Sequence, residues 1–266
     1  MVNFECMRAQ AKTMVLILLT AFMGPNAVAQ FIPNQGQFPT GVFAKQEWGN
    51  GNFWATKDGL IWHSWDPEAA QNMHDRSLET MSIPSHAIRL HFIGARWSQP
   101  EFKTKSSSTV YNYFKGSDPN HWARNVFVYD QLIFRNVYPN IDLELNTHSG
   151  GIKYNWIIHP DGNPKAIKFQ YEGLNSLQVE PQELRLSTSL GDIVETIPLV
   201  YSVRQNGIDT LLTRYTQSGD TLGFSLNSKQ IGRRFKQAVI DPVLVFSTYS
   251  GSKADNFGPG VIAAST

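Results

Sequence analysis

Apolar and polar residues alternate in short stretches from residue 31 onward, which is the pattern of half-buried β-strands. A helical period is almost absent, and turn residues such as Asp-Gly and Asn-Gly separate the stretches. The predicted strands are 53–56, 60–63, 86–93, 126–134, 141–146, 153–158, 167–171, 177–179, 184–187, 199–204, 208–215, 221–226 and 239–249. This spacing predicts an all-β fold of one or two antiparallel, β-sandwich-like domains rather than an alternating βαβ fold.

The clearest unit is a hairpin over 141–158, because its alternation and its turn agree. With a two-residue turn, odd positions of the first strand share a face with even positions of the second. One face would then carry Ile141, Leu143, Leu145, Tyr154, Trp156 and Ile158, and the other Asp142, Glu144, Lys153 and Asn155. We expect the apolar face to lie in the core and the polar face to look into water.

Three stretches depart from the strand pattern. Residues 66–70 (DPEAA) offer an N-cap, a proline and an acidic first turn, which predicts a short surface helix. The polar run 103–109 (KTKSSST) predicts a mobile loop. A Pro- and Gly-containing segment at 160–164 marks a candidate boundary between a first β domain, 30–160, and a second part, 161–242. The second part is either a separate domain or the second half of the same one.

The first 29 residues predict a secretory signal peptide. A basic start precedes ten apolar residues, 14–23, and residues 27–29 (AVA) match a small-x-small cleavage site. Ten residues of helix rise ~15 Å, about half of a hydrocarbon core, so the stretch is too short to cross a membrane. We expect cleavage between Ala29 and Gln30, and a secreted product outside the cell or on the outer cell surface.

Composition narrows the function classes. Cys6 is the only cysteine and lies within the predicted signal, so the mature chain would have no disulfide and no thiolate metal site. Removal of residues 1–29 takes two of 23 Lys and Arg and one of 22 Asp and Glu, which leaves 21 of each. A chain of net charge zero has no long-range attraction for nucleic acid or anionic lipid. No second apolar run approaches membrane-spanning length.

Asp142 and Glu144 are the candidate catalytic carboxylates. At i and i+2 of a strand they point the same way, ~7 Å apart, a separation that glycoside hydrolysis can use. However, they alternate with apolar residues as solvent-facing acids do, and Lys153 across the hairpin would lower their pKa. We therefore keep the hydrolase as the least favoured hypothesis and predict no enzyme.

The sequence predicts no cofactor. His86 and His91 differ by five positions, so on one strand they face opposite sides, and the other histidines are scattered. Common catalytic and nucleotide-binding motifs do not occur. Asp118 and Asp161 lie in turns where calcium would be the natural ion, but the dense acidic spacing of a calcium loop is missing.

Seven tryptophans raise the hypothesis of a carbohydrate-binding module. Most are expected in the core, where aromatic residues fill space in a chain without disulfides. Trp62 and Trp65 lie three positions apart and so on opposite faces of one strand, which would leave at least one exposed. They are the candidate residues for stacking on a sugar.

Several motifs resemble those of a family of uncharacterised bacterial extracellular domains that precede SBBP-type β-propeller repeats. Residues 31–37 (FIPNQGQ) are similar to the F-x-x-N-x-G-Q opening of that family. The likeness continues at 57–60, 111–114, Gly116, 118–119, Trp122, 137–143, Tyr154, 190–191 and 239–249. Residues 247–255 (STYSGSKAD) resemble the first repeat, S-T-Y-x-G-G-S-x-x-D, with Ser252 in place of the second glycine.

The resemblance implies a large, exported surface protein of the kind found in Bacteroidota, where a C-terminal sorting domain for type IX secretion is common. It attaches no catalytic residues. Residues 243–266 would be a linker and an incomplete first propeller repeat, with further repeats as partners downstream. We therefore expect a non-catalytic structural or adhesive module whose partner is an extracellular polysaccharide or a surface protein.

Overall fold

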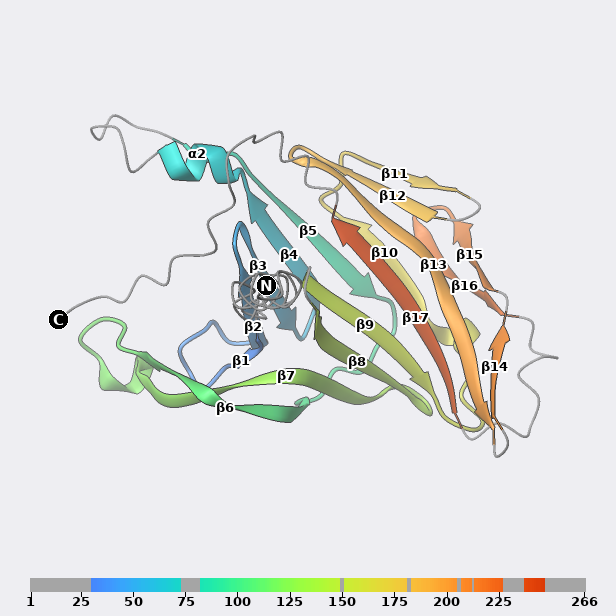
Figure 1. Ribbon diagram of the computed structural model, residues 1–266, viewed down its shortest axis with the longest axis horizontal. Coiled ribbons are helices and arrows are strands. Elements are labelled where there is room, and N and C mark those ends of the chain that lie inside the picture. The colour runs from blue at the N-terminus through green and yellow to red at the C-terminus, as the bar shows by residue number, and fades with distance from the viewer. Residues whose placement is uncertain are drawn as a thin grey trace, which may run out of the picture.

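The computed structural model consists of two large antiparallel β-sheets packed face to face (Figure 1). It describes residues 30–72, 82–148, 151–180, 183–204, 207–211, 213–226 and 237–246. Within them, one α-helix and two short 3-10 helices accompany the strands. The predicted all-β, antiparallel, sandwich-like fold is confirmed. No helix among these residues is long and apolar enough to cross a membrane.

The first sheet has eight strands and combines the beginning of the chain with two segments from its second half. In spatial order the strands are β1 (Ile32–Pro33), β2 (Val42–Trp48), β3 (Gly51–Thr56), β4 (Gly59–Trp65), β5 (Ser85–Phe92), β10 (Lys168–Glu172), β16 (Thr221–Leu226) and β15 (Thr213–Ser218). The predicted hairpin at 53–63 is present as β3 and β4, and Thr56 pairs with Gly59. Only glycine fits at 59, where φ is +131° and a Cβ would lie 2.4 Å from the Leu90 carbonyl oxygen.

The second sheet has nine strands and contains the predicted central hairpin. In spatial order they are β11 (Ser176–Val179), β12 (Glu183–Thr188), β13 (Gly191–Arg204), β17 (Gln237–Phe246), β9 (Gly151–Ile158), β8 (Ile141–His148), β7 (Ala123–Tyr138) and β6 (Glu101–Tyr113), while β14 (Gly207–Leu211) also pairs with β13. Strands β9, β17 and β13 run side by side across the molecule (Figure 1). At the far edge, β6 and β7 extend together as a long hairpin (Figure 1).

Both sheets join strands from either side of residues 160–164. In the first sheet β5 pairs with β10, and in the second β9 pairs with β17. A single cluster of buried apolar residues extends from Phe31 to Ile240 between the sheets. The two parts of the chain therefore share both layers and one main core.

The central hairpin has the predicted register and faces. Ile141 pairs with Ile158, Leu143 with Trp156 and Leu145 with Tyr154. All six side chains are at most 1% exposed and belong to the main core. The apolar face predicted from the alternation is confirmed.

The predicted helix is also confirmed, as α2 (Pro67–Asn72). The Asp66 carboxylate accepts hydrogen bonds from the backbone N–H groups of Glu68 and Ala69 at 2.9 and 3.1 Å. These two bonds satisfy N–H groups that have no partner within the helix, which is what an N-cap does.

Two expectations about connections are wrong. Residues 103–109 form part of strand β6 rather than a loop, because backbone pairing with β7 compensates for their polar composition at the sheet edge. The predicted strand 208–215 divides into β14 and β15, which belong to different sheets. Alternation alone carries no information on such a change of sheet. The predicted signal peptide and residues 247–266 of the predicted propeller entry lie outside the described residues. Residues 243–246, the start of the predicted linker, are the end of β17 and pair with β13.

Candidate functional site

Asp142, the first candidate carboxylate, lies near the start of β8 and is buried. The residue is 2% exposed, although the sequence pattern predicted that it faces water. Its oxygens accept hydrogen bonds from the Asn136 backbone N–H, from Arg135 Nη1 and from His159 Nε2, each at 2.8 Å. We call these residues, together with Glu101, the Asp142 cluster.

A bulge in β7 explains why the prediction for Asp142 is wrong. The register between β7 and β8 shifts between Phe134 and Tyr138, and Asn136 adopts a left-handed φ of +50°. This bend places Arg135 and the Asn136 N–H over the carboxylate. Lys153, the predicted partner, instead forms an ion pair with Asp241 at 2.8 Å.

The Asp142 cluster favours ionised carboxylates. Burial alone would raise the pKa of Asp142, but the hydrogen bonds from Asn136, His159 and Arg135 outweigh it and lower the pKa. Arg135 also donates two hydrogen bonds of 3.0 Å to Glu101. These bonds, with help from Lys103, lower the pKa of Glu101 to about 2.

Glu144, the second candidate carboxylate, accepts a hydrogen bond of 2.8 Å from the Asn146 amide and is partly exposed. A glycoside hydrolase needs one carboxyl with a raised pKa to protonate the leaving group. Asp142 has the opposite shift. The arrangement of these two residues therefore gives the hydrolase hypothesis no support.

A second buried carboxyl, Glu195 on β13, was not singled out from the sequence. It is 0% exposed and accepts hydrogen bonds from three tyrosine hydroxyls: Tyr154 at 2.6 Å, Tyr171 at 2.5 Å and Tyr215 at 2.8 Å. Tyr154 belongs to the same sheet as Glu195, whereas Tyr171 and Tyr215 come from β10 and β15 of the other sheet. The Glu195 cluster therefore ties the two layers together through polar groups.

The pKa of Glu195 shifts upward, in contrast to that of Asp142. Burial is the largest cause and raises the pKa, while the three tyrosine hydrogen bonds lower it without reversing the shift. Burial and the neighbouring carboxyl also raise the pKa of each of the three tyrosines. The cluster is enclosed between the sheets, so it offers no access to a substrate.

The two tryptophans proposed for sugar stacking have different surroundings. Trp62 is 2% exposed and packs edge-on against Phe53, with ring centroids 5.1 Å apart, in the main core. Its ring therefore has no face open to a ligand. Trp65 is partly exposed and contacts the His63 ring at 5.9 Å.

An exposed phenylalanine, Phe114, and two partly exposed aromatic residues, Trp122 and Phe127, lie at the end of the β6–β7 hairpin. Phe114 is 58% exposed and Val110 42%, among the highest values for large apolar side chains in the described chain. Trp122 contacts Phe114 at 5.4 Å, and Phe127 pairs with Val110 across the hairpin. Lys105 lies 3.1 Å from the Phe127 ring centroid, and Arg124 lies 5.3 and 5.7 Å from the rings of Phe114 and Trp122.

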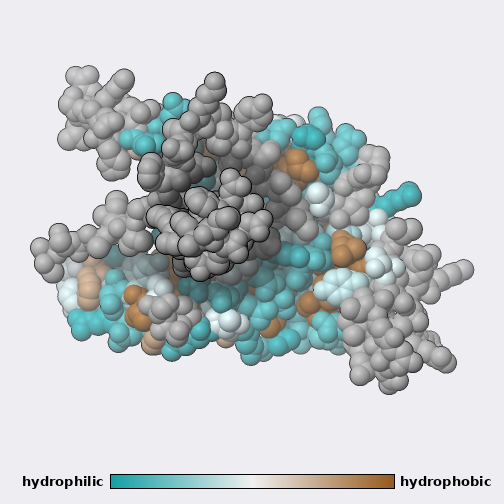
Figure 2. Space-filling model, viewed as in Figure 1, coloured by the Kyte–Doolittle hydropathy of each residue, from teal (hydrophilic) through white to brown (hydrophobic). Residues whose placement is uncertain are grey.

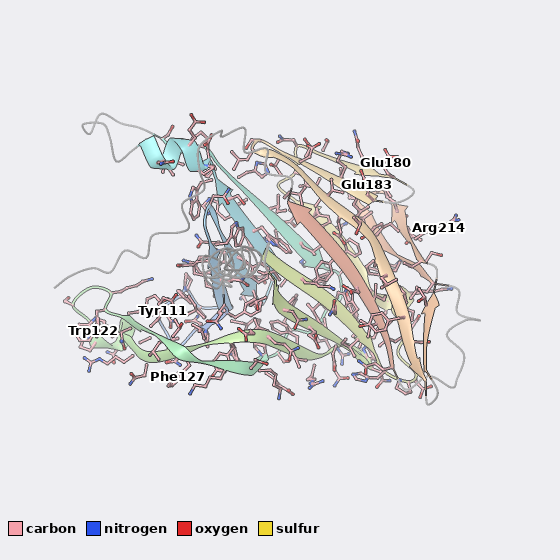
Figure 3. The ribbon with its side chains drawn as sticks, in the orientation of Figure 1. Tyr111, Trp122, Phe127, Glu180, Glu183 and Arg214 are labelled. Carbon is pink, nitrogen blue, oxygen red and sulfur yellow. The ribbon has the colours of Figure 1, made fainter. Side chains whose placement is uncertain are left out.

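We call these residues the aromatic strip: Lys105, Val110, Phe114, Trp122, Arg124 and Phe127. Figure 2 shows apolar surface over this end of the molecule among mostly hydrophilic surroundings. In Figure 3, Trp122 and Phe127 lie at this end of the hairpin, far from Glu180, Glu183 and Arg214. Exposed apolar side chains that cluster in this way mark an interaction surface more often than isolated ones do.

The aromatic strip rests on a small core of its own. Ala123, Val126 and Val128 of β7 point into this core and pack with Ile32 and Phe38. The intervening Arg124 and Phe127 therefore lie on the outer side of the hairpin. The strip is thus one face of a supported structure rather than the surface of a free loop.

The opening segment 31–37 forms this support. Phe31 exchanges two backbone hydrogen bonds with Tyr129 of β7, at 2.8 and 3.0 Å. The Asn34 side chain accepts from the N–H groups of Gly36 and Phe38 at 3.0 and 3.1 Å, which fixes a tight turn. Lys115, beyond the end of β6, donates to the Gln37 carbonyl at 2.9 Å.

A family model described as a domain of unknown function (DUF7948) matches residues 31–243. The chain belongs to the DUF7948 family. The match begins at the opening segment and ends within β17, so it covers both sheets and the aromatic strip. No curated protein and no solved structure matches the chain.

The two turn aspartates of this DUF7948 domain shape the backbone locally. Asp118 accepts from the Asn120 N–H at 3.0 Å and caps the 3-10 helix η1 (Pro119–His121). Asp161 occupies a turn with a left-handed φ of +68°. In the described part of the chain, no group of three or more His, Cys, Asp or Glu residues is placed to hold a metal ion.

Gln30, on the mature side of the predicted cleavage site, is the first described residue, and its amide donates to Asp130 at 2.6 Å. Ala29 lies outside the described residues, so the cleavage site stays a prediction. The sequence motifs included Trp122 and residues 111–114, but the sequence did not predict a binding surface at the strip of this DUF7948 domain. Its residues do not alternate regularly, because Asn125 has a left-handed φ of +56° and the β6–β7 register shifts nearby.

Proposed function

We propose that this chain is a non-catalytic adhesive module of an exported cell-surface protein, and that β-propeller repeats follow it in the full-length protein. The aromatic strip is the observation that supports adhesion most directly. It combines one exposed and two partly exposed rings with exposed cations on a supported hairpin. The two buried carboxyls belong to saturated internal clusters, which fits a scaffold better than a catalytic centre.

Export and the propeller context rest on sequence features alone. The apolar stretch 14–23 with its AVA site supports a cleaved signal, and residues 247–255 resemble a propeller repeat. Mass spectrometry of the protein recovered from intact cells tests the first point, and a mature N-terminus at Gln30 is expected. An uncleaved N-terminus on a protein retained inside the cell would contradict export.

Adhesion is tested with beads that carry the purified chain. The beads are applied to immobilised bacterial surface material, either untreated, treated with protease, or treated with periodate to destroy glycans. We expect attachment of the wild type and its loss in the Phe114→Ala/Trp122→Ala variant, which removes two rings of the strip. Leu199→Ala is the matched control, because Leu199 is 54% exposed but lies on β13.

Equal attachment by the strip variant and the wild type would contradict this function. Release of reducing sugar from the glycans by the wild type would also contradict it, because a non-catalytic module leaves the polymer intact. A carbohydrate-binding module is the second candidate, and the exposed aromatic rings of the strip favour it. Sensitivity of the attachment to periodate would support that candidate.

A further inference from the structure

We infer that the aromatic strip binds an acidic polysaccharide, a glycan whose repeating unit carries carboxylate groups such as uronates. This inference rests on the proposed adhesive function and gives it a ligand class. It requires two features in the same place: flat apolar faces for the C–H side of sugar rings, and free cations for the carboxylates.

The apolar feature is a set of rings held in place. Trp122 donates its indole N–H to the Gly116 carbonyl at 3.1 Å, and it lies edge-on to Phe114 with an interplanar angle of 85°. Because the hydrogen bond fixes the polar side of the indole, little rotamer entropy is lost when a ligand covers the ring. A pre-organised, partly exposed tryptophan beside an exposed phenylalanine suits a flat, rigid ligand.

The cationic feature is a local excess of positive charge. The whole hairpin, residues 101–138, contains five Lys and Arg (Lys103, Lys105, Lys115, Arg124, Arg135) and three acids (Glu101, Asp118, Asp130), so it has a formal charge of +2. The whole chain has a formal charge of only +1. A ligand with carboxylates would therefore be attracted to this hairpin more than to the rest of the surface.

Two of these five cations are free to bind an anion, since Arg135 is paired with Glu101 and Asp142. Lys103 forms an ion pair with Glu101 at 3.1 Å, and Lys115 donates to the Gln37 carbonyl. Lys105 and Arg124 are exposed and have no carboxylate partner among the described residues. Lys105 lies over the face of the Phe127 ring, and Arg124 lies over the rings of Phe114 and Trp122. A sugar stacked on the exposed Phe114 ring would therefore bring its carboxylate close to Arg124.

A neutral glycan and an anionic membrane are the competing partners. A neutral glycan would use the rings but would not require Lys105 or Arg124. An anionic membrane would use the cations and accept the apolar side chains at its interface. The acidic polysaccharide is favoured because the exposed rings are flat and fixed, and because the unpaired cations lie next to them.

The test uses the purified chain with polygalacturonate as the acidic glycan, dextran as the neutral glycan, and vesicles of phosphatidylglycerol and phosphatidylcholine. Affinity electrophoresis or calorimetry at low and high salt measures binding. We expect binding to polygalacturonate that weakens as salt rises, with at least about tenfold weaker binding to dextran and to vesicles.

Two double variants separate the contribution of the aromatic rings to binding from that of the cations. Phe114→Ala/Trp122→Ala and Lys105→Gln/Arg124→Gln should each weaken polygalacturonate binding by about tenfold or more. Leu199→Ala and Arg214→Gln are the controls, since both residues are exposed and lie away from the strip, and they should bind like the wild type. Circular dichroism checks that every variant is folded.

Equal affinity for dextran and polygalacturonate, unchanged binding by the cation variant, or preferential binding to vesicles would each overturn the acidic-glycan assignment. A failure of the acidic-glycan assignment can be distinguished from a failure of the proposed adhesive function. If the ring variant abolishes bead attachment while polygalacturonate neither binds nor competes, adhesion stands and this ligand class is wrong.

Discussion

Two carboxyl groups of this protein are withdrawn from water, yet their surroundings push their pKa values in opposite directions. Asp142 is 2% exposed and is bound by a guanidinium, an imidazole and a backbone N–H near the start of β8 in the second sheet. Glu195 is 0% exposed and is bound by three neutral hydroxyls between the two sheets. The pKa of Asp142 falls and that of Glu195 rises.

The difference shows that the number of hydrogen bonds does not set the charge state of a buried carboxyl. Each carboxyl accepts three hydrogen bonds. Arg135 supplies positive charge from a partly exposed position, whereas tyrosine hydroxyls supply only dipoles. The Asp142 cluster thus stabilises a charge, and the Glu195 cluster stabilises the contact between two layers.

The largest effect is expected from Glu195→Ala. This change removes the acceptor of three hydroxyls and leaves a cavity between the sheets, so the free energy of unfolding should fall by about 3–5 kcal/mol. Urea denaturation measures it. Glu195→Gln keeps the shape and part of the hydrogen bonding and should cost clearly less. If Glu195→Gln lost as much stability as Glu195→Ala, an amide of the same shape could not replace the carboxyl group.

A smaller loss, about 2 kcal/mol, is expected from Asp142→Asn, because the amide keeps one acceptor but gives up the attraction to Arg135. His159→Gln retains a donor and should lose less than Asp142→Asn. Both are compared by urea denaturation at pH 7. If Asp142→Asn were as stable as the wild type, the cluster would contribute nothing that a neutral side chain cannot supply.

The pH dependence of the two clusters should have opposite signs. Asp142 has a lowered pKa, so its contribution is complete above its unfolded pKa of about 3.9 and is lost as the pH falls through the folded value. Glu195 has a raised pKa, so its contribution is complete below its unfolded pKa of about 4.3 and is lost as the pH rises through the folded value.

Urea titrations from pH 3 to pH 8 test these signs against the matched variants. The stability gap between wild type and Asp142→Asn should close toward pH 3. The gap between wild type and Glu195→Gln should instead shrink as the pH rises. If the two stability differences changed in the same direction with pH, the predicted contrast between the Asp142 and Glu195 clusters would be wrong.

The smallest effect is expected at an ion pair that is exposed on both sides. Arg89 and Glu172 lie 3.5 Å apart, with side chains 44% and 59% exposed. Glu172→Gln should change the free energy of unfolding by less than about 0.5 kcal/mol, because water and salt screen such pairs. A loss of stability comparable to that of Asp142→Asn would mean that the exposed pair Arg89–Glu172 contributes as much as the partly buried pair Arg135–Asp142.

The sequence predicted the local β structure better than it predicted the sites. The hairpin at 141–158 was correct in register and faces, because alternation and turn length specify both. The burial of Asp142 was missed, because it depends on a bulge of two extra residues in a neighbouring strand that leaves no periodic trace. Glu195 lies outside the predicted strands 184–187 and 199–204, and only the opposite sheet reveals two of its tyrosine partners.

The aromatic strip was missed for a related reason. The number and spacing of the tryptophans led to Trp62 and Trp65 as candidates for sugar stacking, and Trp62 is a core residue. Phe114 and Phe127 gave no pattern of their own, since left-handed Asn125 interrupts the alternation that would have placed them on one face. The opening segment 31–37 was recognised as a motif, but its role as a support for the hairpin depends on contacts with β7 and Lys115.

The most direct test of the account measures unfolding and bead attachment on the same two variants, Asp142→Asn and Phe114→Ala. The account predicts that Asp142→Asn loses about 2 kcal/mol of stability and still attaches. It predicts that Phe114→Ala changes the stability by less than about 0.5 kcal/mol and weakens attachment. Loss of attachment with Asp142→Asn in a folded protein, together with normal attachment by Phe114→Ala, would contradict it.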